Sequence, residues 1–167
     1  MSSAKRLIPV MLILSILCSL LLTAPASAAQ AKSVPPLQME YNGQTLTRGR
    51  LIYSGSYLCY NGASVGDEFF ADEEDSYLLF VLRAKVNPSS YTGQSMVGTV
   101  NFSFQNTWVV KSTSFAIHPD TNHFGEDTYL MVYNERPEYN RYMPSFSLTT
   151  QDRIDADIQM DVYNYHK

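Results

Sequence analysis

Apolar and polar residues alternate with a period of two along much of the chain. The clearest case lies near the C-terminus, where one set is Ile154, Ala156, Ile158, Met160 and Val162, and the intervening set includes Arg153, Asp155, Asp157 and Asp161. A strand places these sets on opposite faces, whereas a helix would scatter the apolar side chains around its circumference. We therefore predict a strand with one face against a core and its charges in water.

Other segments favour strands as well. Residues 77–86 (YLLFVLRAKV) are apolar on both faces, which is typical of a central strand. Further β-rich segments are 51–60, 100–105, 108–117 and 128–134, with a shorter one marked by Phe146 and Leu148. Asn42-Gly43 suits the positive φ angles of a hairpin turn, and Asn61-Gly62 is a second turn signal.

These segments make seven or eight strands, without a convincing amphipathic helix. Because each one-sided sheet needs another apolar face to cover it, we predict an all-β fold, an antiparallel β-sandwich, with a barrel as the alternative. No internal repeat and no sign of a second domain interrupts residues 38–167, so we assign them to one domain.

The N-terminus has the order of parts found in secretory signal peptides. Lys5 and Arg6 precede an apolar run at 7–22, and small residues follow it. Since 16 residues fall short of the roughly 20 that span a bilayer as a helix, we favour cleavage, after Ala28 or alternatively Ala31. We thus expect a signal peptide at 1–28, a flexible leader at 29–37, and a protein that is secreted or associated with the cell envelope.

Composition narrows the class further. Without Lys5 and Arg6, ten basic residues face 16 acidic ones, so the mature charge is −6, which argues against nucleic-acid binding. All 12 Tyr, 8 Phe and the single Trp belong to the mature chain. Its one cysteine, Cys59, has no internal disulfide partner and is interpreted as a small buried hydrophobe, with a reactive or intermolecular thiol as the alternative. A hydrophobic core must therefore hold the domain together.

Two stretches resemble a known family. Residues 77–90 form an aliphatic strand that ends in Asn87 and small polar residues, and 148–162 form a polar turn followed by the last alternating strand, without the Pro-Gly usual in that turn. This pattern is similar to the immunoglobulin-like secreted and lipoprotein domains of Gram-positive bacteria, including the mycobacterial immunoprotective extracellular protein. The resemblance implies an immunoglobulin-like sandwich and an extracellular setting, with no catalytic residues to transfer.

Two motifs suggest chemistry but have simpler interpretations. Residues 62–66 match G-x-S-x-G around Ser64, but no helix is predicted after them to support a nucleophile elbow. Residues 118–127 hold His118, His123 and three carboxylates, yet the histidine spacing matches no usual zinc pair, and Pro, Asn and Gly indicate a turn-rich loop. We expect no enzyme activity and no required cofactor.

An acidic stretch is the better metal candidate. Residues 67–75 carry six carboxylates in nine positions, and calcium prefers several oxygen ligands. We name Asp72, Glu74 and Asp75 as its ligands if calcium binds. The simpler interpretation is a charged loop that keeps the protein soluble.

Tyrosine and arginine gather in residues 133–144, which are polar and punctuated by proline. Both residue types are enriched at binding hot spots, and exposed loops commonly carry recognition. We therefore predict ligand binding by Tyr133, Arg136, Tyr139, Arg141 and Tyr142, with local packing at the sandwich edge as the alternative. The expected function is non-enzymatic binding of a protein or glycan at the bacterial cell surface or outside the cell; the rival is an assembly subunit that pairs through edge strands.

Overall fold

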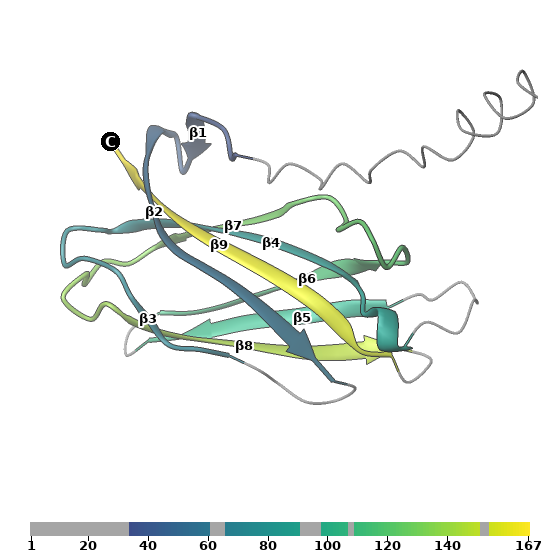
Figure 1. Cartoon of the computed structure of the whole chain (residues 1–167). Helices are drawn as coiled ribbons and strands as arrows, with labels where there is room; N and C mark the ends of the chain where they lie inside the picture. Colours follow the sequence, from purple (N-terminus) through teal and green to yellow (C-terminus); the bar gives the residue numbers. More distant parts are fainter. Residues whose placement is uncertain (1–33, 61–65, 91–97, 107–108, 151–153) are drawn as a thin grey trace, which may run out of the picture. The chain divides into compact units, whose positions relative to one another are not determined.

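The computed structural model describes residues 34–60, 66–90, 98–106, 109–150 and 154–167 (Figure 1). The predicted signal peptide and most of the leader lie outside these residues. The strands are β1 (Gln38–Tyr41), β2 (Gln44–Cys59), β3 (Phe69–Phe70), β4 (Tyr77–Val86), β5 (Gly98–Gln105), β6 (Val110–His118), β7 (Thr128–Tyr133), β8 (Arg141–Thr150) and β9 (Ala156–His166). A 3₁₀ turn, η1, spans Pro88–Ser90.

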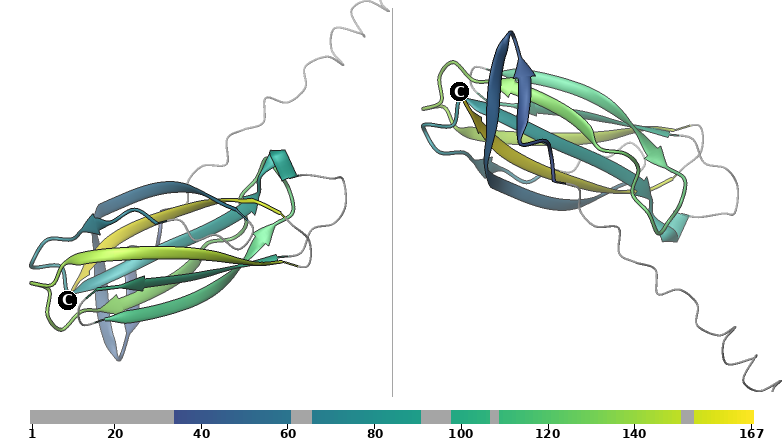
Figure 2. Two further views of the ribbon diagram at one scale, coloured as in Figure 1. Left: turned by 90° about the horizontal axis from the view of Figure 1, so that it is seen from below. Right: turned by 90° about the horizontal axis from the view of Figure 1, so that it is seen from above.

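The fold is all-β, as predicted, with nine strands in the described residues, where seven or eight were expected. Hydrogen bonds connect them in the order β1-β2-β9-β4-β6-β5-β8-β3, and β7 also pairs with β4. Figure 2 shows β2, β9, β4 and β7 as one layer and β6, β5 and β8 as the other. This arrangement is compatible with the predicted sandwich.

Strand β6 connects the two layers. Residues Val110–Ala116 pair with β5 in antiparallel fashion, whereas Ile117 and His118 pair with β4 in parallel. The parallel contact is a departure from the all-antiparallel arrangement that we predicted. Strand β4 pairs with β9 along its whole length, and also with β7 over Tyr77–Leu82 and with β6 near its end. It is therefore central, as its apolar character on both faces indicated.

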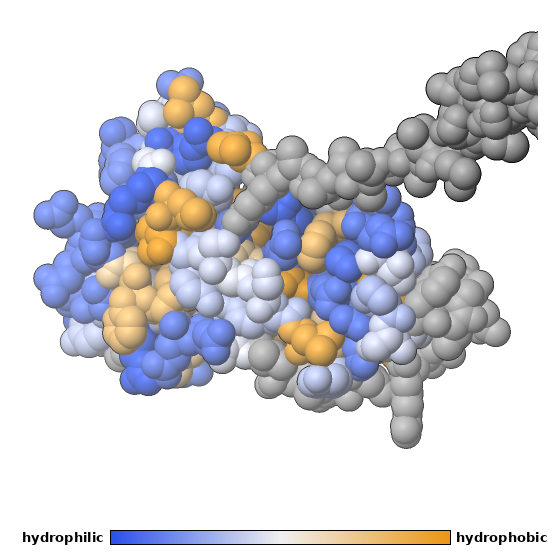
Figure 3. All heavy atoms as spheres, viewed as in Figure 1, coloured by the Kyte–Doolittle hydropathy of each residue, from blue (hydrophilic) through white to orange (hydrophobic). Residues whose placement is uncertain are grey.

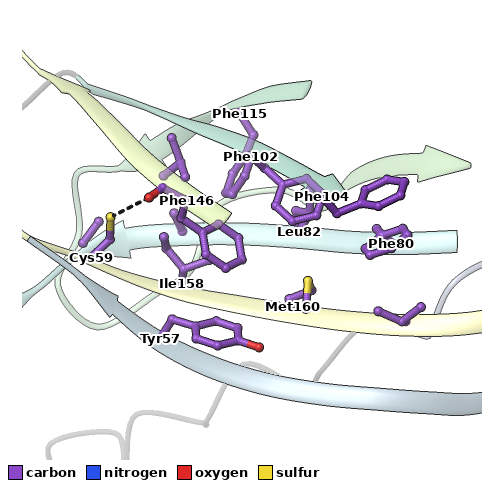
Figure 4. Packing of buried hydrophobic residues seen from close by; sticks show 14 of the residues in the cluster. Tyr57, Cys59, Phe80, Leu82, Phe102, Phe104, Phe115, Phe146, Ile158 and Met160 are labelled. Atoms are coloured by element: carbon purple, nitrogen blue, oxygen red, sulfur yellow. Dashed lines mark hydrogen bonds between the residues drawn. The ribbon is translucent and has the colours of Figure 1, made fainter. Parts of the chain in front are cut away.

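The core between the layers is rich in aromatic rings (Figure 4). Eight of them follow one another in a circuit with neighbouring centroids 4.8 to 5.7 Å apart: Tyr53, Phe69, Tyr142, Phe104, Phe80, Phe102, Phe146 and Tyr57. A hydrogen bond of 2.6 Å between the hydroxyls of Tyr57 and Tyr53 closes the circuit. The circuit thus contains five of the eight phenylalanines and three of the 12 tyrosines.

A second apolar cluster covers the other face of the β9–β4 layer, where we expected the side chains of β9, but not those of β4, to face water. Leu46 from β2 is buried there against Leu79, Val81 and Tyr165, and Met39 and Tyr41 from β1 pack on it. Register shifts around Leu51 bend β2, and the β1–β2 hairpin lies across this face (Figure 2, right). The hairpin turn has the predicted positive φ angles, 50° at Asn42 and 74° at Gly43.

This covered face also buries charge. Asp161, expected in water, is only 1% exposed and accepts a hydrogen bond of 3.2 Å from Arg83. Arg83 lies 3.5 Å from Asp127 as well, while Lys85 and Asp157 form an ion pair of 2.9 Å. The strand prediction for β9 was thus right. Its solvent assignment was wrong at Asp161, whereas Asp155 and Asp157 are partly exposed, because the alternation pattern contains no information about the segments that cover this face.

The domain begins earlier than predicted. Pro35 is buried, and its carbonyl accepts a hydrogen bond from the Arg48 guanidinium. The Pro36 carbonyl accepts one of 2.6 Å from the Tyr165 hydroxyl, and the Leu37 carbonyl one of 2.7 Å from the Arg48 backbone. Residues 34–37, which we assigned to the leader, are therefore attached to the strands.

Candidate functional site

The five predicted recognition residues are divided between a loop and a strand. Tyr133 ends β7, and Arg136 and Tyr139 belong to the connection that follows. Arg141 and Tyr142 instead begin β8, which is much longer than the short strand predicted around Phe146 and Leu148. Pro144 suggested a loop, but it pairs with Phe104 on the β5 side. On its other side no described strand pairs with β8 at Pro144, and proline is tolerated at such a position.

Tyr142 is a core residue and cannot serve a surface ligand. It is fully buried, and its ring stacks on Phe69 at 5.2 Å. Its hydroxyl accepts a hydrogen bond of 3.0 Å from the Asn134 side chain. Burial raises the pKa of Tyr142, so the phenol is neutral in the folded protein. The sequence pattern did not separate this tyrosine from its exposed neighbours.

Arg141 is exposed and has a nearby acidic partner. Its guanidinium donates to both carboxylate oxygens of Glu68, a charge-assisted pair that holds the pKa of Glu68 below its ordinary value. Tyr139 has 39% of its surface exposed. Neither residue lines the hollow described below.

Two buried asparagines hold the 134–140 connection in place. Asn134 accepts a hydrogen bond of 2.9 Å from the Arg136 backbone, and Asn106 donates one of 2.9 Å to the Tyr139 carbonyl. Within the connection, the Tyr139 backbone N–H donates to the Arg136 carbonyl at 2.9 Å. Sequence analysis missed both asparagines, although Asn134 directly follows a predicted strand and asparagine often stabilises such turns.

A hollow of about 350 Å³ lies where β6 begins and β7 ends. Its lining residues are Val109, Val110, Lys111, Tyr133, Glu135 and Arg136. Val110 and Tyr133 are 68% and 39% exposed, so apolar and aromatic surface is available beside the charges. Two of the five predicted residues, Tyr133 and Arg136, thus meet at one site, together with Val110 and Lys111 from a strand more than twenty positions earlier.

Tyr133 also borders a second hollow of about 260 Å³. Its other lining residues are Glu74, Ser76, Tyr77, Tyr165, His166 and Lys167. The ring of Tyr133 stacks on that of Tyr77 with centroids 4.8 Å apart, and the Lys167 ammonium lies 5.8 Å from the centroid of Tyr77. Because Tyr77 is largely buried, it supports one face of the Tyr133 ring. We call the two hollows together the Tyr133 groove.

The predicted calcium ligands have other partners. Arg50 pairs with Asp72 and, at 3.2 Å, with Asp75. Asp75 is buried and accepts a further hydrogen bond of 2.6 Å from Asn164, whereas Glu74 lines the second hollow. In the parts of the chain that the structure describes, no group of three His, Cys, Asp or Glu side chains is arranged to hold a metal ion. The Arg50 guanidinium thus pairs with two of the three carboxylates that we had considered for calcium.

The remaining motifs add no reactive group to the Tyr133 groove. Asp120 accepts a hydrogen bond of 2.8 Å from the Asn122 backbone and pairs with His123, which agrees with the predicted turn-rich loop. Ser64 lies outside the described residues, and the backbone of Gly66 packs directly against the Pro144 carbonyl. Cys59 is buried, as expected, and burial raises the pKa of its thiol to about 11 (Figure 4).

Comparison with known proteins gives no relative from which a role could be taken: no family model matches the chain, and no curated protein is detectably similar. Within the described residues, no helix is both long and apolar enough to cross a membrane. On the face shown in Figure 3, apolar residues form several patches separated by polar ones.

Proposed function

We propose that this protein is a secreted, non-enzymatic binding module that recognises a protein or a glycan at the bacterial cell surface or outside the cell. The observation that carries the proposal is the Tyr133 groove. There an exposed tyrosine, supported from behind by Tyr77, lies beside Arg136 and Lys111. Aromatic and arginine side chains held rigidly in a concave surface are the usual anchors of recognition.

Preorganisation supports a binding role. The hydrogen bonds of Asn134 and Asn106 order the connection that carries Arg136, so less conformational entropy is lost when a ligand binds. The extracellular setting rests on the signal-peptide pattern of residues 1–28 and on the resemblance to immunoglobulin-like secreted domains.

Retention on cell-envelope material tests the proposal. The chain recovered from culture medium is passed over immobilised envelope from the producing bacterium. We expect the wild-type chain to be retained and Tyr133→Ala to be lost, because the aromatic anchor is removed. Tyr129→Ala is the matched control, since Tyr129 is 41% exposed on the same strand and lines neither hollow. Equal retention of Tyr133→Ala and wild type would reject the site.

An assembly subunit is the second candidate. Along Val110–Ala116, strand β6 pairs with β5 on one edge, and no described strand pairs with its other edge. We rank it lower because Lys111 lies on this edge, and edge lysines disfavour strand addition. Size-exclusion chromatography separates the candidates, because an assembly subunit elutes well above the mass of a monomer whereas a lone binding module does not.

A further inference from the structure

We infer that the partner of this module is a protein, one extended segment of which adds as a further strand to the open edge of β7. This inference rests on the proposed function and specifies the class of partner and the way in which it is bound. Three features carry it: the backbone groups that β7 directs outward, the lack of edge protection on β7, and the side chains beside this edge.

The register of β7 identifies the backbone groups that face its open edge. The Asn134 N–H donates to the Ser76 carbonyl at 2.8 Å, in the register that places Leu78 opposite Val132. Hydrogen-bonded pairs alternate with non-hydrogen-bonded ones in an antiparallel ladder, so every second residue of β7 bonds to β4. The intervening residues direct their N–H and C=O groups away from β4: Tyr129, Met131 and Tyr133. No strand in the described ranges pairs with this edge.

Edge protection distinguishes β7 from the other open strands. Natural edge strands discourage pairing by being very short or by carrying lysine, proline, bulges or inward-pointing charges. Strands β1 and β3 have only four and two residues. Strand β6 has Lys111, which lies opposite Phe104 and therefore on the core-facing side. Strand β8 has Pro144, and β2 has register shifts around Leu51.

None of these features is present in β7. Its sequence is TYLMVY, six residues without a charge, a proline or a glycine, and its register with β4 is regular. These residue types favour strands. The open edge of β7 is therefore competent to pair with a further strand.

The side chains beside this edge favour an uncharged segment of large residues. Tyr129, Met131 and Tyr133 share one face of β7, and the two tyrosines are 41% and 39% exposed. On the core-facing side, Leu130 is only partly buried where it packs against the core. Aromatic and β-branched residues pair well across neighbouring strands. A partner strand of such residues covers both faces of the β7 edge.

The end of the edge provides a place for an anchoring side chain. The hollow of about 350 Å³ is lined by Tyr133 and Val110, where β7 ends and β6 begins. In strand addition, backbone hydrogen bonds supply affinity and pockets for side chains supply selectivity. A protein strand matches the two-residue repeat of N–H and C=O groups along β7, and a sugar chain does not.

Edge variants on the immobilised envelope test the inference. Met131→Pro removes an outward N–H without removing a bond to β4, and proline is tolerated at such a position. We expect at least about tenfold less Met131→Pro to be retained than wild type, because the added strand loses a donor. Met131→Ile is the matched control, since it keeps the N–H, and should stay within about twofold of wild type. Equal retention of Met131→Pro and wild type would overturn the inference.

Amide hydrogen exchange keeps the test decisive if circular dichroism shows that Met131→Pro is unfolded. The wild-type chain is measured free and bound to envelope. In the bound chain we expect the amides of Tyr129, Met131 and Tyr133 to exchange at least about tenfold more slowly, because the added strand protects them. Unchanged exchange at these three amides in the bound chain would overturn the inference.

Treatment of the envelope distinguishes the possible occupants. Proteinase K should abolish retention, whereas periodate, which cleaves sugar rings, should leave it within about twofold. The reverse result would overturn this inference and leave the proposed function standing, with a glycan as the ligand. Retention that is lost in Tyr133→Ala but not in Met131→Pro would also keep the proposed function and reject strand addition. A chain that elutes alone as a dimer, and as a monomer when it carries Met131→Pro, would assign the edge to a second copy and overturn the inference.

Discussion

Tyr133 and Tyr142 lie nine positions apart in the sequence. Their environments in the fold determine which of them is accessible at the surface and which belongs to the core. Tyr133 is partly exposed beside two hollows, whereas Tyr142 is fully buried among phenylalanine rings. In the sequence both have an asparagine, an arginine and a proline within four positions. The sequence therefore indicated that tyrosines gather in this segment, but not which of them contributes to the core.

Substitutions at Tyr142 should affect stability rather than recognition. Tyr142→Ala removes a fully buried ring, and we expect a loss of about 3–5 kcal/mol in the free energy of unfolding. Tyr142→Phe loses the hydrogen bonds of the hydroxyl with Asn134 and Asn106, about 1 kcal/mol each, and should leave ligand binding at the Tyr133 groove unchanged. Urea denaturation and retention on immobilised envelope measure the two effects. A folded Tyr142→Ala variant of wild-type stability would contradict this assignment.

Among the elements, β9 and β8 show where local patterns succeed and where they fail. The alternation of β9 predicted its strand and core face because side-chain direction in a strand has a period of two. In β8 the same alternation of Tyr142, Pro144, Phe146 and Leu148 is present, but proline made the segment look like a loop. At Pro144, β8 pairs with β5 on one side and with no described strand on the other, and such a position permits proline. A local pattern does not reveal which strand lies on which side.

The connection between β2 and β3 provides a test at the scale of elements. A Cβ atom on Gly66 would overlap the backbone carbonyl of Pro144 in β8. We expect Gly66→Ala to lower the free energy of unfolding by roughly 1–3 kcal/mol, because backbone atoms cannot move aside as a side chain can. Gly125→Ala is the control, since its Cβ would meet its nearest atom at 3.4 Å. Urea denaturation of both variants measures the difference; similar losses would show that the Gly66 contact is unimportant.

At the scale of the whole domain, buried phenols link stability to alkaline pH. Burial raises the pKa of Tyr57, Tyr142, Tyr163 and Tyr165. When a phenol has a higher pKa in the folded state than in the unfolded state, its contribution to the free energy of unfolding is fully present below the unfolded-state pKa of about 10. As pH rises above that value the unfolded chain releases these protons more readily, so the contribution is lost.

We therefore expect the urea midpoint to fall between pH 9 and 11 after a flat region near neutrality. Tyr142→Phe removes one of these groups, so its midpoint should fall less steeply than that of wild type. The comparison requires denaturation curves at each pH for both proteins. A wild-type midpoint that stays constant up to pH 11 would show that the phenols titrate alike in the folded and unfolded states.

The sequence by itself determined the all-β class, most strand positions, the hairpin turn at Asn42-Gly43 and the buried character of Cys59, because each depends on local periodicity or residue type. Tertiary structure decided the rest. The hairpin over the second face of β9, the pairing of Arg50 with the acidic stretch, and the meeting of Lys111 with Tyr133 all join residues more than twenty positions apart. Such contacts depend on how the strands are ordered and bent, and no local pattern encodes that order.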